Sequence, residues 1–146
     1  MEQAVEQMAQ TVAQLSNGII PLSTLYIGLN ALITLILAVL VVMARVRTKT
    51  NIGDGGNEDM IKATRAHGNN VEYVPITLLV IMAVEIAAAP GWFVHTLGAG
   101  LTIARAAHAV GMHMTTGTSP GRFAGSVLGW LVLLAGSVAC IYYGLN

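Results

Sequence analysis

Polar side chains that could hold a small molecule gather in the stretch RAHGNNVEYVP, residues 65–75, at the start of an apolar run. On a helix that turns about 100° per residue, Arg65, Asn69 and Glu72 lie within about 60° of one another, and Tyr73 flanks this face. Two other polar residues of the stretch point elsewhere: His67 and Asn70. A cation and a carboxylate on one face can receive the carboxylate and the amine of a small zwitterion or anion.

A second polar stripe consists of Arg105, His108 and Met112, which share one face of a later helix. An arginine in a membrane helix costs about 2.5 to 3.5 kcal/mol on insertion scales, so it normally turns inward toward a partner or a polar cavity. Both stripes fall at the same end of their apolar runs. The sequence therefore predicts that they line one cleft.

Spacing alone leaves a structural interpretation open. In that case Arg65 and Glu72 pair with each other or with Arg105, and this ion-pair network holds the helices together. The chain would then be a non-catalytic membrane scaffold or a transport-like bundle. For Glu85, at the far end of the same apolar run, we favour a structural role.

The composition places these stripes in a membrane protein. The 146 residues are 55% hydrophobic and 10% charged, with a mean hydropathy of +0.69. This leaves too few polar groups to cover a water-soluble domain. Because a spanning helix needs about 20 residues, four spans fit the apolar runs at residues 19–44, 73–89, 91–103 with its continuation, and 123–143. We expect no metal site and no nucleic-acid partner.

The basic residues indicate how the chain is oriented in the membrane. All of them lie near two loops: Arg45, Arg47, Lys49, Lys62 and Arg65 around the first, and Arg105 and Arg122 around the third. The positive-inside rule then puts both loops in the cytoplasm and both termini outside.

Helix and turn signals divide the chain into two parts. Residues 1–18 are expected to be an amphipathic or disordered segment, and residues 19–146 a four-helix transmembrane domain. Asn57, followed by two acidic residues, is typical of a helix cap and predicts that the second helix begins well before its apolar run. Short links favour an up-down-up-down bundle.

Glycines mark two further features. The sequence GDGG at residues 53–56 lacks the Lys-Ser/Thr pair of a phosphate-binding loop, so we interpret it as an ordinary loop. Gly121, Gly125 and Gly129 are spaced four apart in the last helix, which predicts close helix packing within the chain or between subunits.

The pattern Arg65-Ala66-His67-x-Asn69-x-x-Glu72-Tyr73-x-Pro75 resembles the helix-2 signature of the MAPEG superfamily, the membrane-associated proteins in eicosanoid and glutathione metabolism. The resemblance extends from about residue 22 to 143, and with the GDGG loop it is strongest to the small bacterial branch, which resembles microsomal glutathione transferases. It implies an all-α, integral membrane four-helix bundle. It further implies a homotrimer in a bacterial inner membrane, with glutathione bound in clefts between subunits near the cytoplasmic side.

The resemblance also assigns residues. Those at family positions associated with glutathione are Arg45, Arg65, His67, Asn69, Glu72, Tyr73, Arg105 and His108. Arg45 would face the cleft from the neighbouring subunit. Arg122, at the start of the last helix, matches the arginine that stabilises the glutathione thiolate. A nearby cation lowers a thiol pKa, and Arg122 stays protonated, so it is not the base that removes the proton.

The implied activity is that of a glutathione transferase, a glutathione-dependent peroxidase or both, with glutathione as co-substrate. The second substrate would be a lipophilic electrophile or a lipid hydroperoxide that arrives from the bilayer. Met112 stands where several members have a tyrosine, and Phe123 where the prostaglandin type has a serine. These departures argue against specialised eicosanoid chemistry. The alternative within the same fold is a site for another thiol or anion.

Overall fold

The computed structural model describes residues 3, 5–8, 21–115 and 117–146. Helices and turns make up these residues, with no strand among them, and the expected all-α class is confirmed for this part of the chain. The long helices are α2 (Leu22–Thr48), α3 (Glu58–Ile86), α4 (Gly91–Met114) and α5 (Pro120–Leu145). Most of the expected N-terminal segment, residues 1–18, lies outside the described residues; residues 3 and 5–8 are helical and exposed.

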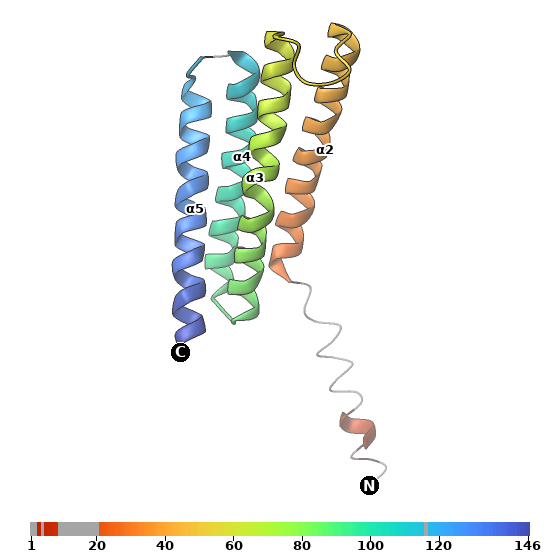
Figure 1. Ribbon diagram of the computed structural model, residues 1–146. Coiled ribbons are helices and arrows are strands. Elements are labelled where there is room, and N and C mark those ends of the chain that lie inside the picture. The colour runs from red at the N-terminus through yellow and green to blue at the C-terminus, as the bar shows by residue number, and fades with distance from the viewer. Residues whose placement is uncertain (1–2, 4, 9–20, 116) are drawn as a thin grey trace.

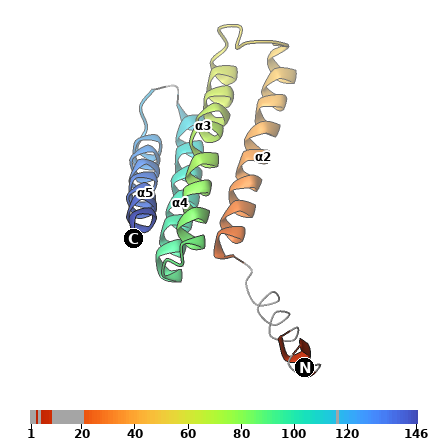
Figure 2. The same cartoon turned by 60° about the horizontal axis from the view of Figure 1, so that its bottom comes forward.

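The four long helices lie side by side, and each runs opposite to the one before it (Figure 1). Figure 2 shows the same arrangement from a second direction. The α2–α3 loop and the α4–α5 link lie at one end, and the C-terminus lies at the other. The two loops that carry basic residues therefore share one end of the molecule.

The helices differ in how well they suit a membrane. Within the described residues, α2, α3 and α5 are long and apolar enough to cross a bilayer. The sequence predicted a fourth span, but α4 does not reach the same hydropathy, because it carries Arg105 and three histidines among small residues. Large apolar side chains on α2 lie exposed, including Leu32, Leu35 and Ile36, as expected for a surface in contact with lipid.

The core lies between α3 and α4. Each of these helices packs against all three other long helices, whereas α2 and α5 do not touch each other. One buried cluster joins α3, α4 and α5 through Ile81, Leu101 and Val132. A second joins α2, α3 and α4 through Leu37, Ala66 and Met112. The chain therefore has a central helix pair flanked by α2 on one side and α5 on the other.

The glycines of α5 allow it to approach α4 closely. A Cβ atom on Gly125 would lie 2.6 Å from the Ala104 carbonyl oxygen and 2.6 Å from the His108 amide nitrogen. A Cβ on Gly129 would lie 2.3 Å from Nη2 of Arg105. The predicted packing role of these glycines is thus confirmed, and the contact is within the chain.

The α2–α3 loop has the local chemistry that the sequence indicates. Oδ1 of Asn57 accepts hydrogen bonds from the amides of Asp59 at 3.0 Å and Met60 at 3.3 Å, so Asn57 caps α3 as predicted. Gly53, Gly55 and Gly56 have φ angles of 70°, 56° and 69°. Glycine adopts this left-handed backbone at little cost, which explains three glycines in so short a loop.

Glu85 fixes the other end of the molecule. Its carboxylate accepts hydrogen bonds from the amides of Leu22 and Ser23, the latter at 2.9 Å. It thereby supplies acceptors to the first turn of α2, where Pro21 offers no side-chain cap. This geometry supports a structural role for Glu85.

Replacing Glu85 with alanine should therefore lower the free energy of unfolding by about 1 kcal/mol, the usual effect of losing a helix cap. Chemical unfolding in detergent, followed by circular dichroism, measures it. Glu85→Gln keeps one carbonyl acceptor and should lose less. An alanine variant as stable as the natural protein would show that these two hydrogen bonds do not hold α2 in place.

Candidate functional site

Arg122 lies in the first turn of α5, and Ser119 fixes that turn against α4. The Ser119 hydroxyl accepts a hydrogen bond from the Arg122 amide at 3.3 Å and donates one to the Gly111 carbonyl at 3.0 Å. Gly111 has no room for a side chain, because a Cβ there would lie 2.3 Å from the Arg122 amide nitrogen. The backbone of Arg122 is therefore held firmly relative to α4.

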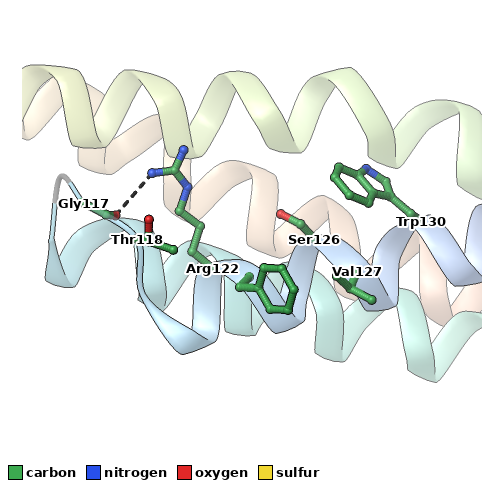
Figure 3. Close-up of a pocket in the computed structure, with 7 residues that line it drawn as sticks. Gly117, Thr118, Arg122, Ser126, Val127 and Trp130 are labelled. Atoms are coloured by element: carbon green, nitrogen blue, oxygen red, sulfur yellow. Dashed lines mark hydrogen bonds between the residues drawn. The ribbon is translucent and has the colours of Figure 1, made fainter.

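Arg122 lines a pocket of about 340 Å³ on α5. Figure 3 shows Arg122, Ser126 and Trp130 projecting to the same side from successive turns of this helix. Arg122 as a residue is half-buried, and its guanidinium donates one hydrogen bond, from Nη1 to the Gly117 carbonyl at 3.3 Å. The pocket is polar at the Arg122 end and apolar at the Trp130 end.

The polar end of this pocket favours an anion. The N-terminus of α5 carries the positive end of the helix dipole, and the Arg122 guanidinium adds a full charge beside it. Four of its five N–H groups make no hydrogen bond within the described residues. They can receive a ligand oxygen or sulfur at the mouth of the pocket.

Arg105 connects three helices beneath this region. Its side chain is only 3% exposed; Nη1 donates to Oδ1 of Asn69 at 3.0 Å and Nη2 to the Gly125 carbonyl at 3.3 Å. The guanidinium carbon also lies 5.8 Å from the ring centre of Tyr73, within cation–π range. Because Gly125 follows Arg122 by one helical turn, these contacts put the polar face of α3 and the α5 pocket at the same depth.

The stripe on α4 is buried as a whole. Arg105, His108 and Met112 all face inward, which confirms that they share one side of the helix. Met112 packs with Leu37 and Ala66, so it belongs to the core. The backbone of His108 abuts Gly125, and its ring is buried.

The stripe on α3 faces outward at its two charged positions. Arg65 and Glu72 are exposed, and neither makes a hydrogen bond or ion pair within the described part of the chain. Asn69 and Tyr73 are half-buried and turn toward Arg105. Asn70 points elsewhere, as expected, and donates to Thr34 of α2 at 2.8 Å. His67 is half-buried.

The structural interpretation holds for only part of this set. Arg105 ties helices together by hydrogen bonds to Asn69 and Gly125, whereas Arg65 and Glu72 do not form the ion pair that a network would need. Across the described ranges, the ion pair that forms is Arg47 with Asp59, at 2.9 Å on the surface. An exposed pair of this kind contributes little to stability.

The Arg45 side chain contacts the loop that follows its own helix. Its Nη1 lies within hydrogen-bond distance of the carbonyls of Thr50, Asn51 and Gly53, at 3.3, 3.1 and 3.2 Å. These contacts close the turn after α2, and α2 does not touch α5, where Arg122 lies. One chain therefore does not bring Arg45 and Arg122 together, and a role for Arg45 in a neighbouring subunit's cleft stays a prediction.

Sequence reasoning missed several residues of the pocket, although signals for some of them exist. Ser119 directly precedes Pro120, which is the signature of a capped helix start. Ser126 and Trp130 follow Arg122 by four and eight residues and therefore share its face. Thr118 and Gly117 lie in the link before α5, and no periodicity could place them.

Comparison with known proteins identifies the family of the chain. The MAPEG family profile matches residues 23–142 of the chain. The chain is also 34% identical, over 121 residues, to Inner membrane protein YecN of Escherichia coli strain K12 and to the same protein of Escherichia coli O6:H1 strain CFT073. Each alignment covers 83% of this chain and 91% of the relative. No solved structure matches. The apolar helices and these matches together show that the chain is a membrane protein of the MAPEG family.

Proposed function

We propose that this protein is a membrane-bound glutathione transferase, a glutathione-dependent peroxidase, or both. The observation that carries the proposal is the Arg122 pocket: a guanidinium with unused donors, at a helix N-terminus, beside an apolar cavity. A thiolate is the nucleophile in such chemistry, and a neighbouring cation raises the thiolate fraction at neutral pH. Family membership supports glutathione as the thiol.

The polar face of α3 would hold the rest of the cofactor. Arg65 is free to receive a glutathione carboxylate, and Glu72 is free to receive its amine. Asn69, positioned by Arg105, offers an amide between them. Because Arg65 and Glu72 face outward from one chain, a second subunit is needed to close the cleft over them. A homotrimer with clefts between subunits meets this requirement.

Glutathione, the second substrate and solvent supply every atom and electron that the proposed reactions need. The glutathione thiol loses its proton to solvent, and the sulfur attacks an electrophilic carbon to form a C–S bond. A leaving group departs with the electron pair, or a proton adds where the substrate is an activated alkene. With a lipid hydroperoxide, two glutathione molecules become the disulfide while the O–O bond is reduced to an alcohol and water. Arg122 stabilises the thiolate and does not move a proton.

The membrane supplies the second substrate. We propose that α4 is a fourth span, shielded by α3 and α5, with the basic loops in the cytoplasm and both termini outside. The E. coli relative is named as an inner membrane protein, which supports the bacterial inner membrane as the location. A lipophilic electrophile or hydroperoxide would then enter from the bilayer and glutathione from the cytoplasm. Calorimetric titration with glutathione and with other low-molecular-weight thiols tests the choice of thiol.

Replacing Glu72 or Arg65 with glutamine should weaken glutathione binding about tenfold each, because each change removes one charge-assisted contact. Thermal unfolding should not change, since both side chains lack partners within the described chain. Isothermal titration calorimetry gives the Kd. Glu58→Gln and Lys49→Gln, exposed at the same end of the molecule, are the matched controls. Variants that lose stability yet bind glutathione normally would instead support the scaffold interpretation.

A further inference from the structure

A groove runs along the outer face of α2 and α4, away from the pocket on α5. It has a volume of about 480 Å³ and is lined by apolar side chains, among them Leu37, Leu40, Ala106 and Val110. It shares no residue with the Arg122 pocket, and α2 and α5 do not touch. Its size falls within the range of about 300 to 1,000 Å³ that is usual for small-molecule sites.

The groove adjoins a charged pocket at the basic end of the molecule. This second pocket, of about 180 Å³, shares Leu40 and His113 with the groove and adds Arg47, Lys62 and Asp59. Arg47 pairs with Asp59, whereas Lys62 is half-buried and has no partner among the described side chains. The pocket therefore keeps an excess of positive charge, carried by Lys62.

His113 lines both the apolar groove and the charged pocket. Its Nδ1 lies 2.9 Å from the Ala109 carbonyl. A carbonyl only accepts, so Nδ1 carries the hydrogen in this contact and Nε2 is left for a ligand. His113 therefore adds a second polar group, its Nε2, to the pocket that Lys62 lines.

The length of the combined site matches one leaflet of a bilayer. From Ile33, at the inner end of the groove, to Arg47, at its charged end, the helix rises about 21 Å at 1.5 Å per residue. Half of a bilayer with its headgroups is about 20 to 22 Å thick. With Ile33 near the bilayer centre, the apolar part would lie at the depth of acyl chains, and Lys62 and His113 would lie nearer the phosphates.

We propose that this groove binds an anionic phospholipid, with an acyl chain between α2 and α4 and the headgroup phosphate at Lys62 and His113. Basic pockets between membrane helices on the cytoplasmic side recognise anionic headgroups in this way. A phospholipid fills both parts of the site at once and is present wherever α2 crosses a bilayer. The site does not depend on the activity proposed for Arg122.

Native mass spectrometry of the intact protein in detergent tests the headgroup. Added dioleoyl phosphatidylglycerol should be retained in preference to dioleoyl phosphatidylcholine. Lys62→Gln should weaken phosphatidylglycerol binding about fivefold, the effect of one basic residue at a membrane surface. Lys49→Gln removes a charge at the same end but outside the groove and should change nothing. Equal retention of the two lipids, unaffected by Lys62→Gln, would overturn the proposal.

A second variant tests the acyl-chain part. Ala106→Phe fills the groove at an exposed position and should remove bound phosphatidylglycerol, whereas Leu134→Phe, on the exposed face of α5, should not. Circular dichroism establishes that both variants fold. Undiminished lipid binding by Ala106→Phe would overturn the proposal. So would a fall in the mass of the protein assembly without loss of lipid, because it would show that a second copy of the chain occupies the groove.

Discussion

Replacing Arg122 with alanine should lower turnover with glutathione by about 10²- to 10³-fold, the usual effect of removing a group that stabilises developing or standing negative charge at a reaction centre. The Arg122 side chain makes one hydrogen bond, at 3.3 Å, to the Gly117 carbonyl in an exposed link. Removing the side chain should therefore lower the free energy of unfolding only slightly. The cap by Ser119 uses the Arg122 backbone and survives the change. Glutathione binding and the mass of the assembly should therefore be largely retained.

The direct readout of this variant is the thiolate itself. Ultraviolet difference absorbance on mixing with glutathione reports the thiolate, and the variant should show it only at higher pH than the natural protein does. The direction follows because loss of a cation raises the pKa of the bound thiol. Arg122→Lys keeps the charge and should recover part of the signal and part of the turnover.

Two results would count against this role. If Arg122→Ala keeps full turnover, the thiolate is stabilised elsewhere. If neither the natural protein nor the variant produces a thiolate signal or turns over any electrophile or hydroperoxide, the family fold serves here as a scaffold or as a site for another anion.

Local chemistry made much of the fold predictable. The cap at Asn57 and the left-handed glycines of the α2–α3 loop depend on neighbours a few residues away, and the sequence displays those neighbours directly. The inward face of α4 follows from helical spacing together with the cost of exposing Arg105 to lipid. Helical spacing also explains why Asn70 points away from Asn69.

The glycine spacing predicted close packing of α5, but which side chains meet across the helices, and at what distance, was beyond the reach of such reasoning. That Arg105 reaches Gly125 depends on how closely α5 approaches α4, and nothing in either helix alone gives the distance. The pocket beside Arg122 needs Gly117 and Thr118 of the link before α5, which no helical spacing could place. The exposed positions of Arg65 and Glu72 show a further limit, because one chain presents them without a partner. What covers them belongs to the proposed assembly.

Replacing Gly125 with valine should be the most damaging single change at the α4–α5 contact. The new Cβ would lie 2.6 Å from two backbone atoms of α4, the Ala104 carbonyl oxygen and the His108 amide nitrogen. Backbone atoms cannot rotate away as a side-chain end can, so α5 must move outward, at a cost of about 1 to 3 kcal/mol for overpacking. The hydrogen bond from Arg105 to the Gly125 carbonyl stretches or breaks with it.

The outward movement of α5 should also displace Arg122, which lies one turn away on the same helix. A displacement of about 1 Å in a reacting group can lower a rate by about a hundredfold. We therefore expect Gly125→Val to lose both stability and turnover, unlike Arg122→Ala, which should lose turnover alone. Gly28→Val is the matched control, because a Cβ at Gly28 in α2 meets nothing within 4 Å. Unfolding in detergent and turnover with glutathione measure the two effects, and equal values for the two glycine variants would show that the α4–α5 contact is not what positions Arg122.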